Sequence, residues 1–332
     1  MLIESKILRK AVVGVSVSIV ILLVIMAVFN IKISDIASIG LYPFIYSALA
    51  SIIAIVIKGF RLIALTRNYN VNISFRDGIS VRVASEFIAL TSLAFVGDET
   101  FRFGWLLSRG VDKGRALWIA YAEIFFDVII GASIAILSSI YIALYGDITI
   151  GLIVGLVAIS TLTIHTLFVI LSEKGKIKIP NIISRIIKRI LGQRGEKILN
   201  LIDETIIKFS ESAREIFNSA SIGTILVNVV VTIATAILNG ISLLILLNAV
   251  GINLDIVTST LIVYGVLSIA SIPISIGGSG LAELGSWTIL TAITHVNPWG
   301  AILVWRITNY YIPLILSGLT LAIILIRIGG KT

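Results

Sequence analysis

Long uninterrupted apolar segments constrain the fold of this chain more than any other feature. The first of them, Ala11–Phe29, contains 19 residues, and a helix of that length spans about 28 Å, roughly the hydrocarbon thickness of a bilayer. Of the 332 residues, 58% are hydrophobic and 13% are charged, whereas a soluble domain carries about a quarter charged residues. We therefore expect an all-α, polytopic integral membrane protein.

Six segments are apolar and long enough to predict membrane crossings. They are Ala11–Phe29, Leu41–Ile57, Ala116–Tyr145, Ile148–Ser172, Ser221–Val250 and Ala301–Ile326. Two further apolar segments, Val83–Val96 and Ile256–Leu290, have glycines and acidic residues within them or at their ends. These elements fill residues 1–332 as a single transmembrane domain, which leaves no room for an appended catalytic domain.

Lysine and arginine between the apolar segments predict the orientation, because cytoplasmic loops carry an excess of them. Basic residues surround both termini, so we expect a multi-pass protein of the cell membrane with both termini in the cytoplasm. The predicted cytoplasmic loop before Val83–Val96 contains Lys58, Arg61 and Arg82, and basic residues also follow that segment. The same counting places both ends of Ile256–Leu290 on the outer side. Each segment is therefore predicted to be a re-entrant hairpin, entering from opposite faces.

The order of these elements predicts an inverted-topology repeat. Residues 1–145 and 146–332 each read as crossing, crossing, hairpin, crossing, with opposite starting sides. Repeats of this kind build transporters in which interrupted helices meet near the membrane midplane. The alternative is that Val83–Val96 forms an interfacial helix and Ile256–Leu290 forms two short spans.

The second half contains a basic segment, residues 173–218, that we expect on the cytoplasmic side. Apolar residues recur in it at helical spacing between Lys and Arg residues, as in amphipathic helices that lie on anionic inner-leaflet lipid. Nucleic acid is not an expected partner, because aromatic residues are not interleaved with the basic ones.

Charged residues inside crossings are costly and need a reason. Glu123 and Asp127 are four residues apart on one face of a crossing, and Arg306 lies early in the last one. One interpretation is a polar cavity in which Arg306 and other basic groups face an anionic headgroup. The other is an internal network of ion pairs that only fixes helix packing.

Two local patterns have a more specific interpretation. The first contains Gly97, Glu99 and Arg102, and the second runs from Pro273 through Gly277, Gly278 and Gly280 to Glu283. Proline and glycine break helices at membrane depth, and the N-terminus of a broken helix attracts anions. Neither pattern is a nucleotide-binding motif, and with no Cys and only two His we expect no metal or other cofactor.

Both patterns, in this order among the crossings, resemble the transmembrane region of lysylphosphatidylglycerol synthases and their stand-alone, flippase-like relatives. The resemblance extends over nearly the whole chain. Gly97, Glu99 and Arg102 match the family's Gly-Glu and Arg element, and Glu123 and Asp127 fall where the family places acidic residues, with Ile124 in place of an arginine. Further matches are Pro273, Gly277, Gly278, Gly280, Glu283 and Arg306.

The departures from the family's pattern bear on function. The proline usually found before the first Gly-Glu is missing. The soluble domain that attaches an amino acid to lipid in the synthases is not found either. The resemblance thus implies translocation or binding of a lipid headgroup rather than aminoacyl transfer.

Three hypotheses follow for function. The first is a flippase-like protein that binds or translocates a lipid or lipid-linked anionic headgroup and is not an enzyme. The expected substrate-binding residues are Glu99, Arg102, Glu123, Asp127, Pro273, Gly277, Gly278, Gly280, Glu283 and Arg306. The second is a membrane-embedded lipid-modifying enzyme with one of these carboxylates as acid or base. The third is a non-catalytic membrane partner of a separate glycosyltransferase or synthase.

Overall fold

The computed structural model describes residues 2–92, 97–174 and 222–329 and some positions between 184 and 214, with side chains described from Gly14 to Arg327 except at Glu173. The described part of the chain is helical and contains no strand, which confirms the predicted all-α fold. Five segments are long and apolar enough to cross a membrane, as expected of a polytopic membrane protein. They are Leu41–Asn68, Lys113–Tyr145, Ile148–Ser172, Ile222–Ala249 and Trp299–Arg327.

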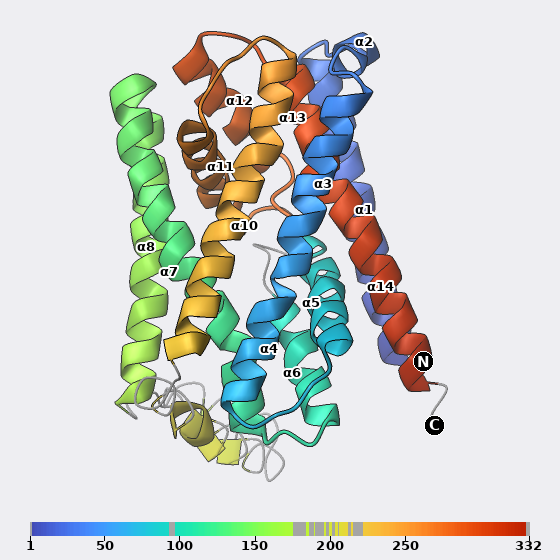
Figure 1. The fold of residues 1–332 in the computed structure, drawn as a ribbon, viewed down its shortest axis with the longest axis vertical. Coiled ribbons are helices and arrows are strands. Elements are labelled where there is room, and N and C mark those ends of the chain that lie inside the picture. The colour runs from blue at the N-terminus through green and yellow to red at the C-terminus, as the bar shows by residue number, and fades with distance from the viewer. Residues whose placement is uncertain are drawn as a thin grey trace.

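The long helices stand side by side and form most of the molecule (Figure 1). They are α1 (Leu2–Val28), α3 (Leu41–Ile57) with α4 (Gly59–Asn68), α7 (Lys113–Tyr145), α8 (Ile148–Glu173), α10 (Ile222–Ala249), and α13 (Trp299–Arg306) with α14 (Ile312–Gly329). The short helix α2 (Ile33–Ala37) joins α1 to α3, and a π-helical turn, η1 (Ile307–Tyr311), joins α13 to α14. The predicted first crossing, Ala11–Phe29, lies within α1 except for Phe29, which follows the end of the helix.

The second crossing is longer than the sequence predicted. It was expected to end at Ile57, before Lys58, but after a single turn at Lys58 the chain continues as α4 to Asn68. Arg61, assigned to a loop by its charge, is therefore fully buried inside the protein. Arg82, also assigned to a loop, is buried in α5 (Phe75–Leu90). The loop assignment of both arginines was wrong, because each has buried acidic partners on other helices.

Two helical hairpins lie between the long helices. Helices α5 and α6 (Asp98–Ser108) occupy the lower half of the molecule in Figure 1, and α11 (Ile256–Ala270) and α12 (Leu281–Thr294) the upper half. The first hairpin begins at Phe75, earlier than the predicted Val83, because Ser74 caps α5 by accepting a hydrogen bond from the Asp77 amide. The tips meet where the Gly277 amide donates to the Ser92 carbonyl over 2.9 Å.

The two termini lie at the same end of the molecule, at the lower end of Figure 1. The turns between α7 and α8 and between α10 and α11 lie at the opposite end. The predicted amphipathic segment 173–218 falls mostly outside the described residues. The symmetry relation between residues 1–145 and 146–332 stays a prediction.

Short polar caps and small residues set the tight turns of the bundle. The Asp147 carboxylate begins α8 by accepting a hydrogen bond from the Ile150 amide over 3.0 Å, which satisfies one of the free amides at a helix start. One turn later, a side chain at Gly151 would approach the Ser139 carbonyl of α7 to 2.7 Å. Only glycine at this position lets α7 and α8 pack so closely directly after their turn.

Candidate functional site

A network of buried ion pairs occupies the interior between the first hairpin and α7. At its centre is Glu123 of α7, whose carboxylate is 2.9 Å from Nε of Arg102 and 3.8 Å from Nε of both Arg61 and Arg82. The three arginines come from α6, α4 and α5. A buried carboxylate is stable only with such partners, so Glu123 joins three separate helices to α7.

Further carboxylates neutralise the outer sides of these arginines. Asp127 forms a two-pronged ion pair with Arg61, and Asp98 pairs with Arg102. Arg82 also reaches Glu86, over 2.8 Å. Arg61 donates a further hydrogen bond to the Thr232 hydroxyl of α10, over 2.8 Å. The Thr232 hydroxyl therefore joins α10 to the charged interior.

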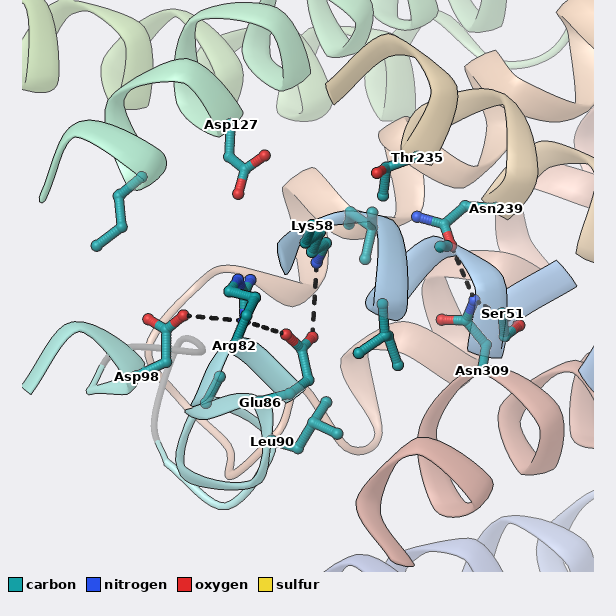
Figure 2. A pocket seen from close by; sticks show the side chains of 15 residues that line it. Ser51, Lys58, Arg82, Glu86, Leu90, Asp98, Asp127, Thr235, Asn239 and Asn309 are labelled. Carbon is teal, nitrogen blue, oxygen red and sulfur yellow. Dashed lines mark hydrogen bonds and ion pairs between the residues drawn. The ribbon is translucent and has the colours of Figure 1, made fainter. Parts of the chain in front are cut away.

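A cavity of about 280 Å³ opens against one side of this network. Figure 2 shows Lys58, Arg82 and Glu86 pointing into it together, with Asp98 and Asp127 facing them. The other polar residues of its wall are Ser51, Thr235, Asn239 and Asn309. Its wall is formed by residues of α3, α5, α6, α7, α10, α11 and η1, so the cavity lies between both hairpins and the long helices.

The charged groups differ in how far they reach the cavity surface. Arg82 has a side chain only 4% exposed, whereas Lys58 is 17% and Asp127 38% exposed. Lys58 is only loosely paired, with its Nζ 3.6 Å from Glu86. Lys58 is therefore the cationic group best placed to exchange its partner for an incoming anion. Asp127 is the most accessible acceptor for hydroxyl or ammonium groups.

A second polar cluster ties the other hairpin to the last crossing. Arg306 Nε lies 2.8 Å from the Glu283 carboxylate, and its Nη2 donates to the Gly277 carbonyl and the Ser279 hydroxyl over 2.8 and 3.0 Å. The same guanidinium stacks 3.7 Å from the centre of the Tyr310 ring. These contacts come from η1 and the residue before it, and π-helical turns often occur at functional sites.

The sequence-predicted site residues thus separate into groups. Arg102, Glu123 and Asp127 belong to the buried network beside the cavity. Glu283 and Arg306 belong to the second cluster. The structure does not bring the two groups together in one pocket.

The glycines and the proline of the second hairpin have backbone roles. Gly277, Gly278 and Gly280 all have positive φ, between 57° and 86°, which lets the chain turn at the hairpin tip. Pro273 is exposed in the loop before them and does not line the cavity.

The free helix N-termini expected at the hairpin tips are occupied by the chain's own carboxylates. Glu99 accepts a hydrogen bond from the Gly97 amide over 2.9 Å, and Glu283 accepts one from the Gly280 amide over 2.7 Å. Glu99 therefore caps α6 and lies outside the cavity wall. These amides do not offer an anion the open site that the sequence pattern suggested.

The sequence interpretation left several residues of the cavity wall out of the site. Lys58 and Arg82 were assigned to a loop, and Asp98 and Asn309 received no role. The sequence does contain one sign that the helix continues beyond Ile57. No Pro interrupts the chain from Ile57 to Asn68, and the apolar residues Leu62, Ile63 and Leu65 follow within one helical turn. That pattern indicates that the helix, with its charges, continues into the protein.

Tyr310 connects the second cluster to the first hairpin, which leads to a stability prediction. Its hydroxyl donates to the Leu90 carbonyl over 2.9 Å. We expect Tyr310→Phe to lower the free energy of unfolding by about 1–2 kcal/mol, because the buried hydrogen bonds of this hydroxyl to the Leu90 carbonyl and to the Ser18 hydroxyl are both lost. The measurement is the thermal unfolding midpoint in detergent.

The neighbouring tyrosine supplies a matched control. The Tyr311 hydroxyl is buried without a hydrogen-bond partner among the described residues. We expect Tyr311→Phe to leave the midpoint unchanged or to raise it. A similar loss in both variants would show that the Leu90 contact is not the cause.

The carboxylates of the network do not gather into a metal site. Among the residues that the structure describes, no group of three or more His, Asp or Glu is arranged to hold a metal ion. Each network carboxylate instead faces an arginine or lysine. This arrangement suits a charged cavity that exchanges ion-pair partners with a polar ligand.

Long apolar helices around two helical hairpins and a charged interior cavity define a multi-pass α-helical membrane protein. The family model for the lysylphosphatidylglycerol synthase TM region matches residues 11–317. The chain therefore belongs to this family of membrane, lipid-related proteins. Comparison of the chain with curated proteins gives no match.

Proposed function

We propose that this protein binds the headgroup of a lipid, or of a lipid-linked anion, in the charged cavity and moves it between the leaflets. The observation that carries the proposal is the cavity itself, which is lined by Lys58, Glu86 and Asp127 and lies beside both hairpin tips. A charged group inside a membrane protein needs polar partners. The cavity supplies both signs of charge to a headgroup leaving the water interface.

Lys58 is the proposed contact for the anionic part of the headgroup. The other cations of the network are arginines held by two or more carboxylate contacts, whereas Lys58 has a single contact at 3.6 Å. Exchanging Glu86 for a phosphate on Lys58 therefore disturbs the network least. Asn239 and Asn309, joined by a 3.3 Å hydrogen bond, lie farther along the wall and provide neutral donors and acceptors.

The proposal involves no chemical step. A general base needs a carboxylate free to take a proton. The network carboxylates and Glu283 are held in ion pairs with arginine or lysine, and Glu99 caps the start of α6. No ATP-binding motif occurs in the sequence. The proposed movement is therefore downhill or coupled to an ion gradient.

The end that carries both termini is proposed to face the cytoplasm. Exposed basic residues concentrate at that end, and they include Arg76, Arg109, Lys113 and Lys174. The opposite turns contain Asp147 and Asp255. This distribution agrees with the excess of positive charge found on cytoplasmic loops. The basic segment 173–218 would then lie against anionic inner-leaflet lipid.

The test is a leaflet-exchange assay with Lys58→Gln. Purified protein is reconstituted into phosphatidylcholine vesicles with a trace of fluorescent phosphatidylglycerol, and an impermeant quencher reports which leaflet holds the label. Wild-type protein is expected to make all the label accessible. Lys58→Gln is expected to slow exchange by roughly tenfold or more, since a charge-assisted contact contributes about 1.5–3 kcal/mol.

Lys32→Gln is the control, because Lys32 is exposed at the start of α2, away from the cavity. It is expected to exchange label at the wild-type rate. The assay is repeated with a fluorescent polyprenyl-phosphate lipid. If wild-type protein and empty vesicles expose equal label with both probes, the transport proposal is overturned.

A further inference from the structure

A second cavity, of about 310 Å³, adjoins the charged one. The two cavities share lining residues from four parts of the chain, namely Lys58, Asp127, Thr235, Asn239 and Leu267. Beyond these shared residues the second cavity continues along α7 past Gly131, Ala132 and Ala135. The space is therefore a continuation of the charged cavity.

The wall becomes apolar with distance from the charged network. Asp127, Gly131 and Ala135 are spaced four apart and share one face of α7. From the first to the last the helix rises about 12 Å. Ala158 of α8 and Tyr264 of α11 close the other sides. The hydroxyls of Thr161, Ser268 and Ser271 also belong to this wall. One end of the space is thus charged, and the other is uncharged and mostly apolar, with methyl groups, an aromatic ring and a few hydroxyls.

This second cavity lies close to the lipid-facing surface. The two helices at its sides, α8 and α10, expose apolar side chains at neighbouring positions, including Ile159 on α8 and Ile237 on α10. These exposed residues face the hydrocarbon of the bilayer in a protein of this class. A lipid chain that enters the cavity from the bilayer would pass helices that present apolar side chains to it.

We propose that the second cavity binds one acyl chain of the lipid whose headgroup occupies the charged cavity. This inference rests on the proposed function and adds where the hydrocarbon goes. A headgroup cannot move inward without its chain. Moving the acyl chain from the bilayer into the cavity gains little free energy, because lipid tails are as apolar as the side chains of the cavity. The role of the cavity is to let the acyl chain follow the headgroup while the acyl chain stays in apolar surroundings.

The direction of the space indicates which leaflet supplies the lipid. Along α7 the cavity extends from Asp127 toward Ala135, away from the end with both termini. A lipid of the leaflet at the terminal end has its chains pointing in this same direction. The observed conformation therefore accepts a lipid from that leaflet.

The first measurement is photo-crosslinking with residue-level mass spectrometry. Wild-type protein is placed in phosphatidylcholine vesicles that contain phosphatidylglycerol with a diazirine on one acyl chain. Crosslinks are expected on Ala132, Ala135 and Ala158, which are 7% exposed or less and so are shielded from the surrounding bilayer. In Lys58→Gln these crosslinks are expected to disappear, while those on exposed Ser133 persist.

The second measurement fills the cavity. Ala135→Leu and Ala158→Leu are expected to slow leaflet exchange by roughly tenfold or more, because each added side chain occupies cavity space that the acyl chain is proposed to fill. Ser133→Leu adds similar volume on the outer face of α7 and is expected to exchange at the wild-type rate. Thermal unfolding checks that each variant is folded. If a variant does not fold, the crosslinks of the wild-type protein still test the inference.

The outcomes separate the two proposals. Normal wild-type exchange without crosslinks inside the cavity overturns the acyl-chain site and leaves the transport function standing. Crosslinks inside the cavity without any exchange support the site and overturn transport. If neither exchange nor crosslinks inside the cavity are found, both the transport function and the acyl-chain site are overturned.

Discussion

Replacement of Glu123 by glutamine is expected to lower the free energy of unfolding by about 3–5 kcal/mol, because removing one member of a buried ion network leaves its partners uncompensated. Glu123 is 1% exposed and is the carboxylate nearest to Nε of Arg102, at 2.9 Å. Arg61 and Arg82 each lose an acidic neighbour as well. The glutamine keeps the shape of the side chain, so the expected loss is electrostatic.

The measurement is thermal unfolding of purified protein in detergent, with Glu99→Gln as control. Glu99 is half-buried, makes no ion pair with the network arginines among the described residues, touches the network only through Asp98, and caps its own helix through the Gly97 amide. A glutamine oxygen can still accept that hydrogen bond, so we expect a change below about 1 kcal/mol. Equal midpoints for both variants would mean that Asp98 and Asp127 alone compensate the arginines.

Replacement of Gly277 by alanine is the second change with a large expected effect. Gly277 has φ of 57°, and an added Cβ would lie 2.5 Å from both the Leu90 carbonyl oxygen and the Tyr310 hydroxyl. A left-handed backbone costs a non-glycine residue about 1–2 kcal/mol, and overpacking adds about 1–3 kcal/mol. We therefore expect a loss of at least about 2 kcal/mol and a separation of the hairpin tips.

The effect is measured by thermal unfolding and by the leaflet-exchange assay. Gly285→Ala is the matched control, since Gly285 lies within α12 of the same hairpin and its Cβ would meet Ile269 at an ordinary 3.5 Å. Alanine there is expected to stabilise the helix by about 0.5–1 kcal/mol. If Gly277→Ala unfolds at the wild-type temperature and retains exchange, the tip contact with Leu90 and Ser92 is not required.

The two predictions concern different parts of the same interior. Glu123 joins the first hairpin to α7, and Gly277 lets the second hairpin approach the first. The charged cavity lies beside both contacts. In the proposed transport, any relative movement of the hairpins would therefore reshape the cavity that holds the headgroup.

Most of the fold was predictable from the sequence. In a membrane, each helix satisfies its own backbone hydrogen bonds, so apolar length by itself indicates where a crossing lies. The crossings at Ile148–Ser172 and Lys113–Tyr145 were found within a few residues. The patterns at Gly97–Arg102 and Pro273–Glu283 likewise identified the two hairpins and the family.

The site was only partly predictable. Glu123 and Asp127 stood out because a charge within an apolar run is costly. Arg61 did not, because it follows Lys58 at the end of an apolar run and resembles an ordinary cytoplasmic flank. Its burial depends on Asp127, 66 residues away in the chain. No local pattern carries that information.

What the sequence by itself determined is therefore the set of helices, the places where they break and the family to which the chain belongs, since these depend on local apolar length and backbone chemistry. The tertiary structure decided which charges are buried together, that Glu99 and Glu283 cap their own helices, and that a charged cavity continues into an apolar one. The physical reason is that the cost of a buried charge is set by its partners, and those partners come from helices far apart in the chain.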